Sequence, residues 1–141
     1  MTVPNSDRVL RWSAVIFLLA LAIHGADHAR RGTEVVSTQI QVAGTIQAVL
    51  GLVAVILVFV RHRWAPYAAI AIGFASAFLF TAAHLLPSWG VFSDSYLTPA
   101  AEAGVTWFSW VTALLEIAAD LVFGWAGVQA LRRRIPVTEP G

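Results

Sequence analysis

The chain has 141 residues, of which 58% are hydrophobic and only 12% are charged. Soluble domains usually contain about 25% charged and about 45–50% apolar residues, so this composition excludes an ordinary water-soluble domain and indicates a membrane protein. The chain has no cysteine, which excludes disulfides, zinc–thiolate sites, iron–sulfur clusters and thiol catalysis, and its net charge of +1 gives no reason to expect a nucleic-acid partner.

Four hydrophobic stretches, each about 20 residues long, follow one another along the chain. They predict an all-α, polytopic membrane protein, with one domain over residues 1–141 folded as a four-transmembrane-helix bundle. The first stretch begins like a secretory signal peptide, but its cleavage site is poor, so we interpret it as a retained span. The predicted spans are residues 12–29, 38–60, 66–86 and 110–131, followed by a disordered tail over 135–141.

Arginine supplies all nine basic residues, and its distribution predicts the orientation of the bundle. Seven arginines flank the span ends on the side of the two termini, whereas Arg30 and Arg31 fall on the other side. Positive residues near span ends concentrate in the cytoplasm, so both termini are predicted to be cytoplasmic, in a multi-pass protein of the inner (plasma) membrane. The seven are Arg8, Arg11, Arg61, Arg63, Arg132, Arg133 and Arg134.

The end of the first span carries a group of ionisable residues. Such residues are costly inside an apolar span and therefore mark functional sites. His24 and His28 are four residues apart, with Asp27 between them. This spacing puts both imidazoles on one face of a helix, where they can share a metal ion. Asp27 could orient a histidine or act as a general base.

The third span carries His84 near its outer end and a stripe of small residues every four positions, which allows close helix packing. The longest connection, residues 87–109, follows this span. Within it, Thr98-Pro99 has the residue types of an N-cap and a first helical position, so the last helix is predicted to begin near Pro99, outside its apolar span. The stripe consists of Ala69, Gly73, Ala77 and Thr81.

The fourth span contains Glu116 and Asp120, one helical turn apart. A rise of about 1.5 Å per residue from the outer span ends places His24 and Glu116 about 9 Å deep, His84 about 7 Å deep, and Asp120 about 6 Å below Glu116. These depths predict one metal site, with zinc or iron as the metal. The candidate metal ligands are His24, His28, His84 and Glu116. The candidate catalytic residues are Asp27, Glu116 and Asp120.

Three further polar residues are candidates for substrate binding. Arg30 and Arg31 would attract a carboxylate or a phosphate, such as a lipid headgroup, beside the histidines. Gln47 lies deep in the second span, where it needs an interhelical hydrogen bond and could complete the site. A structural alternative for the two arginines is pairing with one of the nearby acids, Asp27, Glu34 or Asp94.

Together these features predict metal-dependent, hydrolase-like chemistry or metal binding near the outer leaflet, with a lipidic or amphiphilic substrate that enters from the membrane lipid. Three alternatives stay open. A b-type haem could be held by His28 and His84. A proton-coupled carrier could use Glu116 and Asp120, which would repel each other if both were ionised. Finally, the chain could be an accessory subunit of a larger membrane complex, or a homo-oligomer.

Overall fold

The computed structural model describes residues 5–133, and every regular element in this range is helical. The four long helices contain 27, 22, 20 and 26 residues, and each is long and apolar enough to cross a membrane. The prediction of an all-α chain with four candidate spans is confirmed, and the predicted disordered tail over 135–141 lies outside the described residues. The elements are α1 (Asn5–Arg31), the 3-10 turn η1 (Thr33–Val35), α2 (Thr38–Phe59), α3 (Ala65–His84) and α4 (Trp107–Arg132).

The start of α4 differs from the prediction. The helix begins at Trp107 and not near Pro99. Its N-terminus is fixed by a capping box, in which the side chains of Thr106 and Ser109 each accept a hydrogen bond from the other residue's backbone N–H. The hydroxyl of Thr98, the predicted cap, instead accepts a hydrogen bond of 2.8 Å from a backbone N–H within the preceding connection. Thr98 therefore stabilises the connection, and the helix starts where the reciprocal cap is available.

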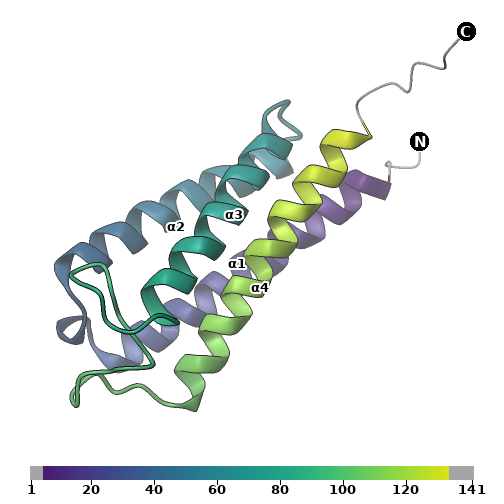
Figure 1. Ribbon diagram of the computed structural model, residues 1–141. Helices are drawn as coiled ribbons and strands as arrows, with labels where there is room; N and C mark the ends of the chain where they lie inside the picture. Colours follow the sequence, from purple (N-terminus) through teal and green to yellow (C-terminus); the bar gives the residue numbers. More distant parts are fainter. Residues whose placement is uncertain (1–4, 134–141) are drawn as a thin grey trace, which may run out of the picture.

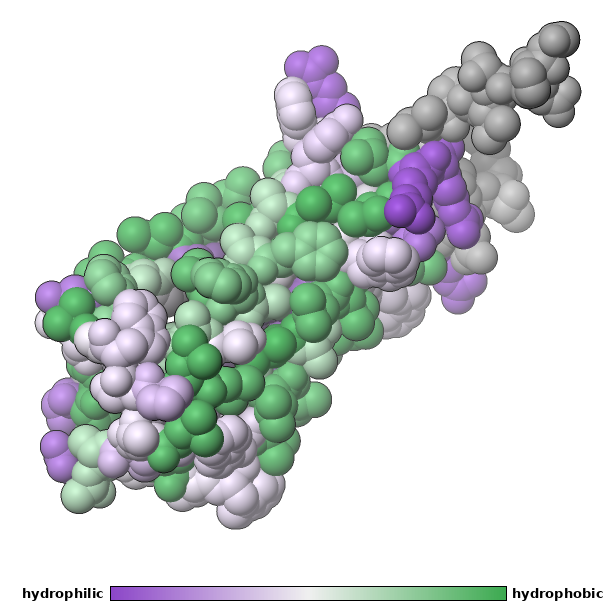
Figure 2. Space-filling model, viewed as in Figure 1, coloured by the Kyte–Doolittle hydropathy of each residue, from purple (hydrophilic) through white to green (hydrophobic). Residues whose placement is uncertain are grey.

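The four helices lie side by side in one bundle (Figure 1). α1 begins and α4 ends at the same end, which also holds the α2–α3 turn and is called here the terminal end. The α1–α2 connection and residues 85–106 lie at the opposite end, called the loop end. α4 packs against α1 and α3, and α2 packs against the same two helices. On the face shown in Figure 2, apolar surface covers the middle of the bundle and hydrophilic residues gather toward its ends.

Small residues and two phenylalanines form the centre of the bundle. The rings of Phe17 and Phe123 are fully buried, with centroids 4.9 Å apart. A Cβ on Gly51 would lie 2.8 Å from the Phe17 ring, and a Cβ on Gly73 would lie 2.5 Å from the backbone nitrogen of Gly124. The backbones of α3 and α4 thus approach closely at the small-residue stripe, as its spacing predicts. This contact sets how closely α3 and α4 pack in the interior of the bundle.

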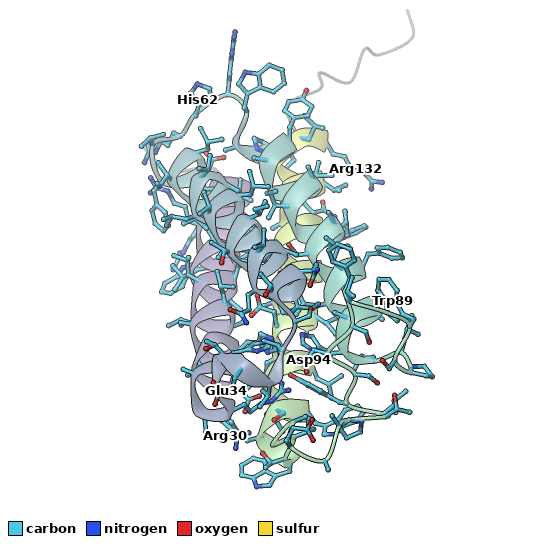
Figure 3. The ribbon with its side chains drawn as sticks, turned by 90° about the vertical axis from the view of Figure 1, so that its left-hand side faces the viewer. Arg30, Glu34, His62, Trp89, Asp94 and Arg132 are labelled. Carbon is cyan, nitrogen blue, oxygen red and sulfur yellow. The ribbon has the colours of Figure 1, made fainter. Side chains whose placement is uncertain are left out.

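Residues 85–106 fold back over the loop end instead of extending away from it. The backbone N–H of Asp94 donates to Ala83 at 3.0 Å, and that of Tyr96 donates to His84 at 2.9 Å. Asp94, Ser95 and Tyr96 are all buried as a result. Figure 3 shows Asp94 in the same end of the molecule as Arg30 and Glu34, far from His62 and Arg132. The connection therefore brings loop residues to the end of α3, where the polar site lies.

Candidate metal centre

Three histidines from two helices meet near the loop end of the bundle. His24 and His28 lie one turn apart on α1, and His84 is the last residue of α3. The ring centroids are 4.8 Å apart for His24–His28, 5.0 Å for His24–His84 and 5.7 Å for His28–His84. One ligand nitrogen of each ring lies within 4.8 Å of the other two. His24 and His84 are buried and His28 is half-buried, so the cluster is inside the protein with one side less covered.

One pair of these nitrogens already has about the spacing of two ligands on a single metal ion. The Nε2 atoms of His24 and His28 are 3.1 Å apart. Two imidazoles on one tetrahedral zinc, each about 2.0–2.1 Å from the metal, have nitrogens roughly 3.3 Å apart. Without a metal, two facing Nε2 atoms can share one hydrogen at most, as a donor and an acceptor. A metal ion would instead use the lone pairs of both nitrogens together with that of His84.

Contacts on the far side of two rings set the tautomers that metal binding needs. The Nδ1 of His84 lies 3.0 Å from the backbone oxygen of Asp94, to which it donates its hydrogen. The Nδ1 of His24 lies 3.5 Å from the hydroxyl of Thr112, which donates its own hydrogen to the backbone oxygen of Ser109. The carbonyl contact places the hydrogen of His84 on Nδ1 and leaves its Nε2 as the ligand atom, and the Thr112 contact favours the same tautomer of His24. Metal-binding histidines are commonly oriented in this way.

A buried ion pair fastens the connection to α1 beside the histidines. The Nη1 and Nη2 atoms of Arg31 donate to the two carboxylate oxygens of Asp94 at 2.7 and 2.6 Å, and its Nε donates to the backbone oxygen of Ala103 at 2.7 Å. The Arg31 side chain is fully buried and that of Asp94 is 5% exposed. The sequence suggested two roles for Arg31, substrate binding or pairing with an acid. The geometry shows pairing with Asp94, and the buried guanidinium of Arg31 is not exposed to a substrate.

Tyr96 is a member of the site that sequence reasoning missed. Its ring centroid is 4.6 Å from that of His84, and the guanidinium of Arg31 lies 5.3 Å from its ring centre. Burial and the nearby Asp94 carboxylate raise the pKa of Tyr96, so its phenol stays neutral at physiological pH. The position of Tyr96 depends on how an irregular connection folds back, and no sequence periodicity signals such a turn.

Asp27 is paired with Arg30 at the first turn of α4. The Nε and Nη2 atoms of Arg30 donate to one carboxylate oxygen of Asp27 at 3.0 and 2.8 Å. Nη2 also reaches the backbone oxygen of Gly104 at 3.0 Å and the hydroxyl of Ser109 at 3.2 Å. Asp27 is fully buried and is not one of the three converging ligands, whereas 41% of the Arg30 side chain is exposed. Arg30 is thus paired, as the structural alternative predicts, and still accessible.

Glu116 lies outside the group of converging ligands, although its depth counted from the sequence suggested otherwise. The α4 residue that contacts His24 is Thr112, one turn closer to the loop end. The reason is the position of α4 along the bundle axis relative to α1. Arg30 on α1 reaches Thr106 at 3.4 Å, so α4 enters about one turn earlier than the depth count assumed. Glu116 consequently sits about 6 Å deeper than the histidine level.

Asp120 and Gln47 occupy the interior away from the histidines. Asp120 follows Glu116 by one turn and is fully buried. The side-chain nitrogen of Gln47, on α2, donates to the hydroxyl of Ser76 on α3 at 3.1 Å, which confirms the predicted interhelical hydrogen bond. Ser76 lies about two turns before His84 along α3. Gln47 therefore joins two helices and does not contribute to the histidine cluster.

Comparison of the chain with protein-family models, with curated proteins and with solved structures gave no match. The fold and the site show which class of protein this is. It is an all-helical chain with four candidate membrane spans and a buried cluster of three histidines that could hold a metal ion. Its function has to be inferred from the chemistry of that cluster.

Proposed function

We propose that this chain is a membrane metalloprotein in which His24, His28 and His84 hold one divalent ion of zinc or iron. The observation that supports the proposal is the convergence of three ligand nitrogens within 4.8 Å inside an apolar bundle. Burying imidazole nitrogens away from water is unfavourable unless they are bonded. One metal ion of borderline softness would bond all three at once, and imidazole is a preferred ligand of both zinc and iron.

A single ion fits this cluster better than a b-type haem. Two axial histidines bind opposite faces of a haem, so the macrocycle would have to lie between His28 and His84. The ring of His24 is 4.8 Å from that of His28 and 5.0 Å from that of His84, so it lies beside the gap between them, where the macrocycle would extend. A haem would need His24 to move out, whereas a single ion needs only that the three rings close slightly around it, because nitrogens that share one tetrahedral zinc lie roughly 3.3 Å apart.

Metal content of the detergent-purified chain tests the proposal. The wild type is expected to contain about one zinc or iron per chain by elemental analysis, with no Soret band in the visible spectrum. His28→Ala and His84→Ala are expected to lose the metal, because two remaining imidazoles bind it far more weakly. His62→Ala is the matched control. It also removes a histidine, but His62 is exposed in the turn between α2 and α3, at the terminal end (Figure 3).

Removal of the metal gives a second readout of the same site. A chelator is expected to lower the unfolding temperature of the wild type and of His62→Ala, since a ligand that binds the folded state stabilises it. The chelator is expected to leave the unfolding temperature of His84→Ala unchanged. Equal metal content in the wild type and His84→Ala would contradict the proposal, as would a wild type that takes up neither zinc nor iron. A Soret band would favour the haem alternative.

Metal-dependent, hydrolase-like chemistry on a lipidic or amphiphilic substrate is a second candidate function. Three-histidine zinc sites keep a fourth position for water, whose pKa falls to about 7 on the metal. His28, half-buried, marks the less covered side of the cluster, and the accessible Arg30 nearby suits an anionic headgroup. Zinc-loaded wild type is then expected to release fatty acid from anionic phospholipid vesicles. Equal release by His84→Ala would exclude this function without affecting metal binding.

A further inference from the structure

A divalent ion among three neutral imidazoles brings two positive charges that the protein has to balance. The charged side chains around the histidines are already balanced, because Arg30 pairs with Asp27 and Arg31 pairs with Asp94. Metal binding would therefore leave this layer with an excess of positive charge in a medium of low dielectric, where an unbalanced charge is costly. Countercharge has to come from a group that is not yet paired.

Glu116 and Asp120 are the carboxylates in the described interior that no cation pairs with. Both are fully buried and lie one turn apart on α4. All four of their oxygens are buried, and none has a hydrogen-bond partner among residues 5–133. Two ionised carboxylates would repel each other in this setting, and each would lack the hydrogen bonds that a buried charge requires. The pair can be accommodated when it carries protons.

The elements packed against this part of α4 bring no competing charge. α2 has no ionisable residue, and α3 has Tyr67 and His84 near its two ends. On α1, the histidines belong to the cluster and the loop-end acid and arginines are paired as described. The other ionisable residues of α1, at the terminal end, are Asp7, Arg8 and Arg11. Glu116 therefore faces Asp120 on its own helix and the histidine cluster one turn away.

The acid pair lies between the histidine cluster and tightly packed helices. Thr112, which contacts His24, precedes Glu116 by four residues, or about 6 Å along α4. Toward the terminal end, the Phe17–Phe123 contact and the close approach of α3 to α4 fill the interior. A charge on the metal would thus act on the acids across a short, poorly screened distance.

We infer that Glu116 and Asp120 supply the countercharge of the bound metal: both carry protons while the histidine site is empty, and they lose one or both when a dication binds. The inference rests on the proposed function. The charges and atoms of this step balance as follows. One dication enters and binds the lone pairs of three neutral imidazoles. Each carboxylic acid that ionises gives one proton to water. No oxidant or reductant takes part. Metal entry and proton exit are therefore linked, and the site exchanges a cation for protons.

Zinc titration by calorimetry counts these protons in the full-length, detergent-purified chain. The titration is run at pH 6, because a zinc-bound water with a pKa of about 7 mostly keeps its proton at this pH. It is repeated in two buffers of different ionisation enthalpy, so that the number of released protons can be calculated from the difference in heat. The wild type is expected to release about one to two more protons per zinc than E116Q/D120N. That variant keeps all three histidines and nearly the same side-chain volumes, so protons from any other source appear in both chains and cancel.

The outcomes separate this inference from the proposed function. Equal proton release by the wild type and E116Q/D120N, with zinc bound to both, would overturn the inference and leave metal binding intact. No zinc binding by the wild type would overturn both.

A second measurement needs only the wild type, should the double variant fail to fold. Dicyclohexylcarbodiimide modifies protonated carboxyl groups in apolar surroundings. It is expected to label Glu116 or Asp120 in the zinc-free chain, and zinc is expected to reduce the labelling severalfold. Labelling of these residues that zinc does not change, or no labelling without zinc, would overturn the inference.

Discussion

The three histidines differ in how firmly the protein holds them. His84 is fixed through Nδ1 by the backbone of Asp94, and His24 is oriented by Thr112 on α4. His28 is half-buried and contacts His24 through its Nε2. Two ligands are thus oriented in advance, and the third is the one with room to adjust when an ion enters. Asp94 has a second role, because its carboxylate neutralises Arg31 beside the cluster.

Asp94→Asn tests this second role. The substitution keeps the backbone oxygen that orients His84 but leaves the fully buried guanidinium of Arg31 without its countercharge. The free energy of unfolding is expected to fall by about 3–5 kcal/mol, measured by denaturant titration in detergent. Glu34→Gln, an exposed acid at the same end, is the control and is expected to change stability by less than about 0.5 kcal/mol. An equally small effect of Asp94→Asn would show that the ion pair does not hold the connection.

The helices could be predicted from the sequence more completely than their ends and their relative positions, for physical reasons. Hydropathy identifies all four helices because each is apolar over a length sufficient to cross a membrane. The start of α4 could not be chosen from sequence, since Thr98 and Thr106 are both good caps and the reciprocal bond of Ser109 decides between them. The His24–His28 pair follows from helix periodicity. The positions of Tyr96 and of Glu116 depend on tertiary folding of a connection and on helix offset, which spacing does not encode.

Gly73→Ala tests whether the α3–α4 contact positions the metal centre. A Cβ at Gly73 would lie 2.5 Å from the backbone nitrogen of Gly124 and 2.6 Å from the backbone oxygen of Asp120, so the helices have to separate. We expect a loss of about 1–3 kcal/mol in unfolding free energy, and weaker zinc binding because His84 moves with α3. Gly44→Ala is the matched control, since nothing lies within 4 Å of its Cβ position. Equal zinc affinity in both variants would show that the helix contact does not set the site.

At the scale of the whole molecule, most arginines lie at the terminal end, whereas the loop end has two, and both of these are paired. Arg30 and Arg31 are each matched by an acid, Asp27 and Asp94, so they contribute little net charge to that end. Among the described residues of the terminal end there are six arginines and one acid, Asp7. Orientation follows the count of positive residues near the span ends, and acids contribute little to it, so the larger number of arginines at the terminal end predicts that this end is cytoplasmic.

Reporter fusions test this orientation directly. Alkaline phosphatase, which is active only after export, is expected to be active when fused after Val36 in the loop end and inactive when fused after His62 or at the C-terminus. A fluorescent protein that folds in the cytoplasm is expected to show the reverse pattern. R30Q/R31Q is expected to keep the same pattern, because it removes positive charge from the loop end alone, although its stability falls. Phosphatase activity at the C-terminal fusion would reverse the assignment, and the histidine cluster would then open toward the cytoplasm.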